Sequence, residues 1–323
     1  MNCSSRRLPR QVSALLFLCV LLGAFSLAHA AEPRELLLSS PRILFLGDSI
    51  TASGGYVAII EAWLRTLPDD RRPLLINGGL TSETVSGLSE AGHAGGKFPR
   101  PDLAERLDRV LTLARPNLVF ACYGINCGIY QPFSTERFEK YQQGIGQLKA
   151  AVEKAGATLV LVTPPFYDDK RSPQDFSYNE VLDRYSDWLI EQRDSGWLVV
   201  DLHGPMTREV ERRRETNPEF TFQPDGVHPN DAGHWFIAQQ LLAWLGEETA
   251  ASSESPQDML EAKGASAEVL PLAQQRMSIL RDAYVGAAGH KRPGIAAGLP
   301  IAEAEARAKE LAKKIDSLRQ SAK

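Results

Sequence analysis

The stretch Ile43-Leu44-Phe45-Leu46-Gly47-Asp48-Ser49-Ile50-Thr51 decides how this chain folds. Its four leading apolar residues predict a strand that is buried on both faces. Gly47 ends that strand, and Asp48, predicted to organise the loop, and Ser49 follow directly. Open α/β sheets bind their ligands at the carboxyl ends of their strands, so Ser49 is a candidate nucleophile. The competing role for Ser49 is that of a helix N-cap.

The chain beyond this stretch alternates between strand patterns and helix patterns. Continuous apolar runs predict further strands, and apolar residues at helical spacing predict the helices between them. The predicted strands are 43–46, 73–76, 117–123, 158–162 and 197–202, and the predicted helices are 56–67, 102–114, 134–154, 179–193 and 231–245. This alternation, with strands that are apolar throughout, predicts an α/β fold with a parallel sheet and helices on both faces.

The composition is that of an ordinary globular protein with a slight excess of acidic residues. The chain has 323 residues, of which 43% are hydrophobic and 24% are charged, and its net charge is −4. The first thirty residues hold three arginines and no acid, so the net charge without them is −7. A mildly acidic body argues against a nucleic-acid partner.

Residues 1–30 have the pattern of a secretory signal peptide. A basic segment with three arginines precedes an apolar core at 14–22, and Ala28-His29-Ala30 forms a small-x-small cleavage site. The apolar core is short for a membrane span, and an uncleaved anchor is the alternative. We therefore expect a secreted or periplasmic protein with no stable membrane insertion after signal cleavage.

The composition changes after the main domain, which is predicted to span residues 41–246. Residues 247–263 are rich in Ser, Ala and Glu and are predicted as a linker. Residues 264–323 contain two amphipathic helices, separated by a break at 289–294. Their apolar stripes are Ala273, Met277, Leu280 and Tyr284 on the first helix and Ala304, Ala308, Leu311, Ile315 and Leu318 on the second. A helical hairpin this short cannot hold a core alone, so we expect it to dock on the main domain or on another chain. The oligomeric state stays open.

Polar residues suited to acyl transfer stand where predicted strands and turns end: Ser49, Gly79, Asn126, and the pair Asp225 and His228. His228 can accept a proton from Ser49, and Asp225, three residues before it, can hold the imidazole in place. The backbone N–H groups of Ser49 and Gly79 and the side-chain amide of Asn126 can stabilise a developing oxyanion.

In four short blocks the chain resembles the SGNH/GDSL hydrolase family, which includes GDSL-type esterases and lipases and lysophospholipase-like esterases. The blocks are Gly47-Asp48-Ser49-Ile50, Asn77-Gly78-Gly79, Gly124-Ile125-Asn126 and Asp225-Gly226-Val227-His228. Ile50 stands where the family usually has Leu. The blocks occur in the family's order and at strand ends, and the resemblance covers residues 41–246.

This resemblance implies a three-layer α/β/α fold of the flavodoxin-like type, to which the C-terminal helical hairpin is an extension. It implies a catalytic triad of Ser49, Asp225 and His228 and an oxyanion hole of Ser49, Gly79 and Asn126. It also implies a serine ester hydrolase that uses no metal and no other cofactor.

The third block departs from the family at Cys127, where the family often has an aspartate that supports the loop. This change leaves the orientation of Asn126 open. A disulfide between Cys122 and Cys127 is possible in an oxidising compartment. Two cysteines five residues apart across a strand end rarely have the required geometry, so two buried thiols are the favoured prediction.

Secretion favours an extracytoplasmic substrate, so the first functional hypothesis is a carbohydrate O-deacetylase. The alternatives are a lysophospholipase or short-chain esterase, an acyltransferase on the same fold, and a non-catalytic carbohydrate-binding or scaffold module. The basic turn His290-Lys291-Arg292 is a candidate to reach over the cleft toward an anionic substrate, and is otherwise a solvated turn.

Overall fold

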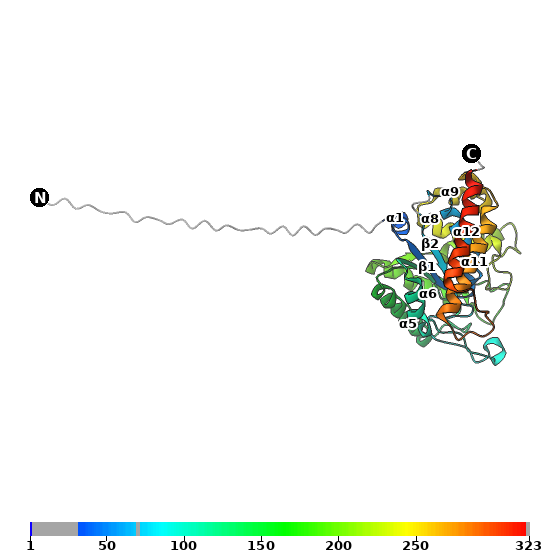
Figure 1. Ribbon diagram of the computed structural model, residues 1–323. Coiled ribbons are helices and arrows are strands. Elements are labelled where there is room, and N and C mark those ends of the chain that lie inside the picture. Colours follow the sequence, from blue (N-terminus) through cyan, green and yellow to red (C-terminus); the bar gives the residue numbers. More distant parts are fainter. Residues whose placement is uncertain (2–31, 69–71, 321–323) are drawn as a thin grey trace. The chain divides into compact units, whose positions relative to one another are not determined.

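A five-stranded parallel sheet forms the centre of the computed structural model, which describes residues 1, 32–68 and 72–320 (Figure 1). The strands are β1 (Arg42–Gly47), β2 (Leu74–Asn77), β3 (Leu118–Cys122), β4 (Thr158–Val162) and β5 (Leu198–Val200), in the order β2-β1-β3-β4-β5. All neighbouring pairs are parallel, which confirms the predicted sheet. The predicted signal peptide, apart from Met1, lies outside the described residues.

Helices cover both faces of this sheet. The α-helices are α1 (Pro33–Leu38), α2 (Ser49–Ser53), α3 (Gly55–Leu64), α4 (Leu107–Ala114), α5 (Thr135–Lys154), α6 (Asn179–Glu191), α7 (His203–Arg214), α8 (Asp231–Trp244), α9 (Glu248–Ser252), α10 (Pro256–Ala262), α11 (Val269–Ala288) and α12 (Ile301–Gln320), and the 3₁₀ helices are η2 (His93–Gly96), η3 (Leu103–Glu105) and η4 (Gln192–Ser195). Right-handed crossovers put α3 on one face and α4, α5 and α6 on the other, because the chain reverses its direction across the sheet after β2. The three-layer α/β/α prediction is confirmed.

The face that α3 and α8 cover has an aromatic core. Phe45 of β1 stacks on Phe120 of β3, with ring centroids 5.1 Å apart. Tyr56 of α3 meets Phe45 edge-on, and Trp244 of α8 meets Phe120 in the same way. These contacts fix the two helices over the two central strands, so the loops at the carboxyl ends of β1 and β3 have a rigid base.

The reversal of chain direction falls between β1 and β3. The loop after β1 turns toward one face, and the loop after β3 turns toward the other. A crevice therefore opens between the two strand ends, which is where sheets of this order bind ligands. Ser49 follows β1 and Asn126 follows β3, so both candidate site residues lie at this switch point.

Two segments differ from their predictions. Residues 203–214 form α7, which the sequence pattern misses because its charged residues leave few apolar positions to reveal a helical period. His203 begins this helix and is buried, and its Nε2 lies 2.7 Å from Asp183 Oδ1. The predicted linker at 247–263 is also wrong: it forms α9 and α10 and buries Met259 and Leu260.

The two C-terminal helices occur as predicted, and α11 and α12 lie side by side (Figure 1). Helix α11 packs against β2, α3 and α4. The predicted apolar stripe of α11 is buried, and so is that of α12 except for its last residue, Leu318, which is partly buried. The hairpin therefore covers the edge of the sheet at β2. No helix in the described ranges has both the length and the apolar character needed to cross a membrane.

Polar contacts hold α11 to the main domain. The Arg276 guanidinium pairs with the Glu61 carboxylate of α3, and both side chains are buried. Asn77 Nδ2 donates to Met277 Sδ at 3.3 Å, and Arg42 Nη2 donates to Tyr284 Oη at 2.8 Å. The extension thus shares a core with the sheet.

Replacing Arg276 by Met should lower the free energy of unfolding by about 3 kcal/mol, because Glu61 then stays buried with only Arg65, whose Nη2 is 3.7 Å away. Urea denaturation measures this change. The matched control is Arg307→Met, which breaks an exposed ion pair with Glu303 and should cost less than about 1 kcal/mol. Equal effects of the two substitutions would contradict a tightly docked hairpin.

Candidate active site

Ser49 lies where β1 passes into α2. Asp48 caps this short helix, since its Oδ1 accepts the Ile50 N–H at 3.0 Å, so Ser49 is the first helical residue and not the N-cap. Gly47 is required here because an added Cβ would lie 2.1 Å from Thr51 Oγ1. The tight strand-to-helix turn leaves the Ser49 side chain partly exposed at the sheet edge.

Ser49, His228 and Asp225 form one chain of hydrogen bonds. Ser49 Oγ lies 2.9 Å from His228 Nε2, and His228 Nδ1 lies 2.7 Å from Asp225 Oδ2. The other carboxylate oxygen, Asp225 Oδ1, accepts the backbone N–H groups of Val227 and His228. About half of each of the His228 and Asp225 side chains is exposed (52% and 58%), so the site opens to solvent.

The hydrogen bonds at Asp225 keep its carboxylate ionised. Partial burial favours the protonated form, but the bonds from His228 and Val227 outweigh burial and hold the pKa of Asp225 below its ordinary value. The carboxylate therefore stays charged across the neutral range and holds His228 by Nδ1, which leaves Nε2 for Ser49.

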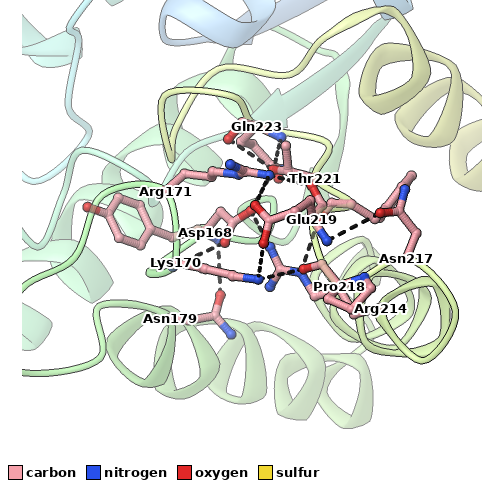
Figure 2. A network of polar contacts seen from close by, with 12 residues as sticks. Asp168, Lys170, Arg171, Asn179, Arg214, Asn217, Pro218, Glu219, Thr221 and Gln223 are labelled. Atoms are coloured by element: carbon pink, nitrogen blue, oxygen red, sulfur yellow. Dashed lines mark hydrogen bonds and ion pairs between the residues drawn. The ribbon is translucent and has the colours of Figure 1, made fainter.

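Figure 2 shows a polar network around Asp168. Asp168 also bonds to Gly226, so this network anchors the turn that carries Asp225 and His228. Asp168 is fully buried, and its Oδ2 accepts Arg214 Nη2 at 2.6 Å and Thr221 Oγ1 at 2.5 Å. Its backbone N–H donates to the Gly226 carbonyl at 2.9 Å. Gly226 has φ +88° and no room for a Cβ beside Ser172. The network thus ties the loop after β4 and the end of α7 to the His228 turn.

Asn126 is oriented by two neighbours. Tyr130 Oη donates to Asn126 Oδ1 at 3.0 Å, and Asn126 Nδ2 donates to the Glu83 carbonyl at 3.2 Å. Because a side-chain amide has two N–H groups, one remains for a ligand. The change to Cys127 therefore leaves the orientation of Asn126 defined.

Both cysteines of the described region, Cys122 and Cys127, are free and buried. Burial raises the pKa of Cys127 to about 11. The backbone N–H groups of Val85 and Ser86 lower it, but burial has the larger effect. The two thiols are therefore packed as neutral groups, as the sequence favoured.

The predicted role of Gly79 as an oxyanion donor needs correction. Its N–H donates to Asn77 Oδ1 at 2.9 Å and is therefore engaged. An added Cβ at Gly79 would lie 2.4 Å from the Ala52 nitrogen. Gly79 thus lets the loop after β2 approach α2 closely, which is a packing role.

Ser82 is a residue that sequence reasoning missed. It has φ +69°, a conformation that side-chain-bearing residues adopt rarely. Its N–H has no hydrogen-bond acceptor among the described residues, and the next residue, Glu83, contacts Asn126. A free backbone N–H beside Asn126 is suited to bind an oxyanion. Nothing in the sequence indicated this conformation of Ser82, because a serine does not by itself predict a positive φ.

Two hollows lie along α2, and one of them is lined by Ser49. A cavity of about 340 Å³, the Ser49 cavity, is lined by Ser49, Ala52, Ser53, Gly79, Thr81, Arg281, Asp282, Val285 and Ile295. A larger groove of about 1480 Å³, the α8 groove, includes Ser53, Pro229, His234, Trp235 and residues of α9 and α10. Ser53 belongs to both, so the two hollows meet at α2. Among the described residues, no group of three or more His, Cys, Asp or Glu side chains is arranged to hold a metal ion.

The basic turn His290-Lys291-Arg292 does not line the Ser49 cavity. The Arg292 guanidinium lies over the Phe98 ring, 4.5 Å from its centroid. The hypothesis that this turn reaches over the cleft therefore gains no support from the cavity lining, to which the extension contributes Arg281, Asp282, Val285 and Ile295.

A Ser-His-Asp chain of hydrogen bonds at the switch point of a parallel sheet is a constellation that serine hydrolases carry on several unrelated folds. The chain belongs to the GDSL-like lipase/acylhydrolase family, which matches residues 45–236. It is an ester hydrolase of the SGNH type, as its sequence blocks suggested.

Several known proteins are similar to this chain. An acetylxylan esterase from Geobacillus stearothermophilus is 22% identical over 231 residues, which are 65% of this chain and 96% of that enzyme. The crystal structure of LAE5, an alpha/beta hydrolase from the metagenome of Lake Arreo, Spain, has 27% identity and a TM-score of 0.50, covering 64% of this chain and 94% of LAE5. BT4096, a gut microbial diltiazem-metabolizing enzyme, has 24% identity and a TM-score of 0.49 over 64% of this chain. The match covers 47% of BT4096, so this chain corresponds to about half of it.

Asp48 should make stability depend on pH. Burial raises its pKa from 3.8 to about 7, so between these values the folded state holds a proton that the unfolded state releases. The contribution of Asp48 to the free energy of unfolding is complete below pH 4 and is lost as the pH rises to 7. The loss amounts to about 4 kcal/mol. Asp48→Asn removes this loss, so its stability relative to the wild type should rise from pH 4 to pH 7.

Urea denaturation of both proteins at several pH values measures this difference. Asp194→Asn, at an exposed position, is the control and should show a constant difference from the wild type. A constant difference for Asp48→Asn as well would mean that Asp48 is ionised in the folded protein.

Proposed function

We propose that Ser49 is the nucleophile of this hydrolase, His228 its general base and Asp225 the residue that orients His228. The observation that carries this proposal is the unbroken hydrogen-bonded chain from Ser49 Oγ to Asp225. His228 Nε2 takes the proton from Ser49 as Oγ attacks the ester carbonyl carbon. The same proton then passes to the departing alcohol oxygen, and an acyl-serine remains.

Water completes the reaction. His228 removes a proton from a water molecule, the resulting hydroxide attacks the acyl carbon, and Ser49 recovers its proton from His228. The half-exposed imidazole has solvent beside it for this step. An acceptor alcohol in place of water would give acyl transfer on the same residues.

Three donors are proposed for the oxyanion: the N–H of Ser49, the N–H of Ser82 and the Nδ2 of Asn126. Ser82 replaces Gly79 in this set, because the Ser82 N–H is free and the Gly79 N–H is not. Removing one such donor typically raises the barrier by about 3 kcal/mol, or a factor of about 100 in rate.

The proposed substrate is an O-acetylated carbohydrate outside the cytoplasm. The similarity to an acetylxylan esterase supports an acetyl ester of a sugar. The signal-peptide pattern at residues 1–30 supports an extracytoplasmic location. The solvent-open site and the α8 groove beside it leave room for a polymer that extends past the reacting ester.

A fluorophosphonate probe should label the wild type at Ser49, and Ser49→Ala should abolish both labelling and ester turnover, the latter by at least about 10⁴-fold. Mass spectrometry of the labelled peptide identifies the serine. Ser195→Ala, at an exposed position on η4, should behave as the wild type. Labelling at another serine, or turnover retained in Ser49→Ala, would refute the assignment.

Substrate preference should favour acetate on a sugar. The measurement compares kcat/KM for acetylated xylo-oligosaccharides with that for p-nitrophenyl esters of increasing acyl length. Highest kcat/KM on the acetylated sugars, and a fall as the p-nitrophenyl acyl chain lengthens, is the expected result. A rise with acyl length would instead point to a lipid ester.

A further inference from the structure

The far wall of the Ser49 cavity comes from the C-terminal extension. Ser49, Ala52 and Gly79 line one side, and Arg281, Asp282 and Val285 of α11 line the other. The family match ends at residue 236, so this wall lies outside the part of the chain that the family shares. The extension is therefore placed to act on the substrate as well as on the fold.

We propose that α11 and the loop after it form the subsite for the alcohol part of the substrate, and that Asp282 and Arg281 recognise a neutral, hydroxyl-bearing ring there. This inference rests on the proposed role of Ser49. A cavity of about 340 Å³ is far larger than the methyl group of an acetyl ester and lies at the lower end of small-molecule sites, so it suits a single ring beside the ester.

The Arg281–Asp282 pair gives the wall both donors and acceptors. Arg281 Nη1 donates to the Ala52 carbonyl at 2.7 Å, and Arg281 Nε and Nη2 both meet Asp282 Oδ1 at 2.9 Å. Asp282 Oδ2 has no partner among the described residues, and its side chain is half exposed (51%). A free carboxylate oxygen accepts from a hydroxyl, and a remaining guanidinium N–H donates to one.

The charges of this wall favour a neutral ligand over an anion. The Arg281 cation is balanced by Asp282 in direct contact. An anionic ligand in this cavity would lie close to the exposed carboxylate oxygen of Asp282. The two negative charges would repel each other. A hydroxylated ring gains hydrogen bonds to both partners without bringing a charge.

The apolar part of the wall is built by a close crossing of the chain. The loop after α11 passes over the helix at Asp282, because Gly298 has no Cβ; an added one would lie 2.2 Å from the Asp282 carbonyl carbon. This crossing holds the loop against α11, and the loop brings Ile295 to the cavity next to Val285. The two aliphatic side chains offer a surface for the C–H face of a ring.

The test compares two esters of the same acyl group. The substrates are a mono-O-acetylated methyl xyloside and p-nitrophenyl acetate, whose alcohol carries no hydroxyl besides the one esterified. Asp282→Ala should lower kcat/KM for the acetylated xyloside by about tenfold or more, since it removes a charged hydrogen-bond acceptor. It should leave kcat/KM for p-nitrophenyl acetate within twofold. Glu310→Ala, at an exposed position on α12, should change neither value.

A bulkier side chain tests the same wall without removing a charge. Ile295→Trp should fill part of the cavity and lower kcat/KM for the acetylated xyloside more than for ethyl acetate, whose alcohol part has no ring to place there. Equal losses on both substrates in Asp282→Ala would mean that the residue acts on Ser49 through α2, and would overturn the proposal. No loss on either substrate would overturn it as well. So would a change in the preferred acyl length of p-nitrophenyl esters in Ile295→Trp, because the cavity would then hold the acyl group.

Binding separates this subsite from the catalytic proposal. Isothermal titration calorimetry of methyl xyloside with Ser49→Ala should give a Kd that Asp282→Ala weakens by about tenfold. If the wild type hydrolyses neither ester while this binding persists, the catalytic proposal fails and the subsite stands. If hydrolysis occurs but methyl xyloside binding does not depend on Asp282, the subsite fails and the catalytic proposal stands.

Discussion

The buried ion pair between Arg106 and Glu83 sets the shape of the site. Their two side chains are 1% and 0% exposed and are joined by two hydrogen bonds of 2.6 and 2.7 Å. Glu83 also accepts from Tyr123 Oη, and Arg106 donates to the Gly78 carbonyl. Loss of one partner would leave a charge buried alone, so the loop after β2 has one stable position against the end of β3. That position brings Glu83, the residue after Ser82, into contact with Asn126.

The rest of the site is held in the same manner, by buried polar groups in the loops and not by the sheet alone. Asp168 ties the His228 turn to the loop after β4 and to α7. Arg276 and Met277 tie α11 to α3 and β2. Because α11 is fixed in this way, its next turn can present a rigid wall to the cavity beside Ser49. The extension thus links the stability of the sheet edge to the shape of the substrate site.

Much of the fold was predictable because parallel strands are apolar throughout and helices have a clear period. Gly47, Asp48 and Ser49 marked the switch point since a buried strand ended there. The pairing of Asp225 with His228 was predictable because three residues separate them in a turn. The failures have physical causes: α7 is too charged to show a period, and α9 and α10 are short helices stabilised by burying Met259 and Leu260. Gly79 was misassigned because its partner, Asn77 Oδ1, depends on how the loop closes.

By itself the sequence determined the order of the candidate site residues along the chain and the parallel α/β fold. Ser49 and Asn126 follow β1 and β3, and His228 lies in the turn before α8. These features follow from local patterns of apolar residues and glycines. Tertiary structure alone decided which N–H groups stay free for an oxyanion, and that α11, more than 200 residues after Ser49, forms the opposite wall of its cavity. Both depend on the packing of distant segments, because a hydrogen-bond donor is free only when no folded neighbour has taken it.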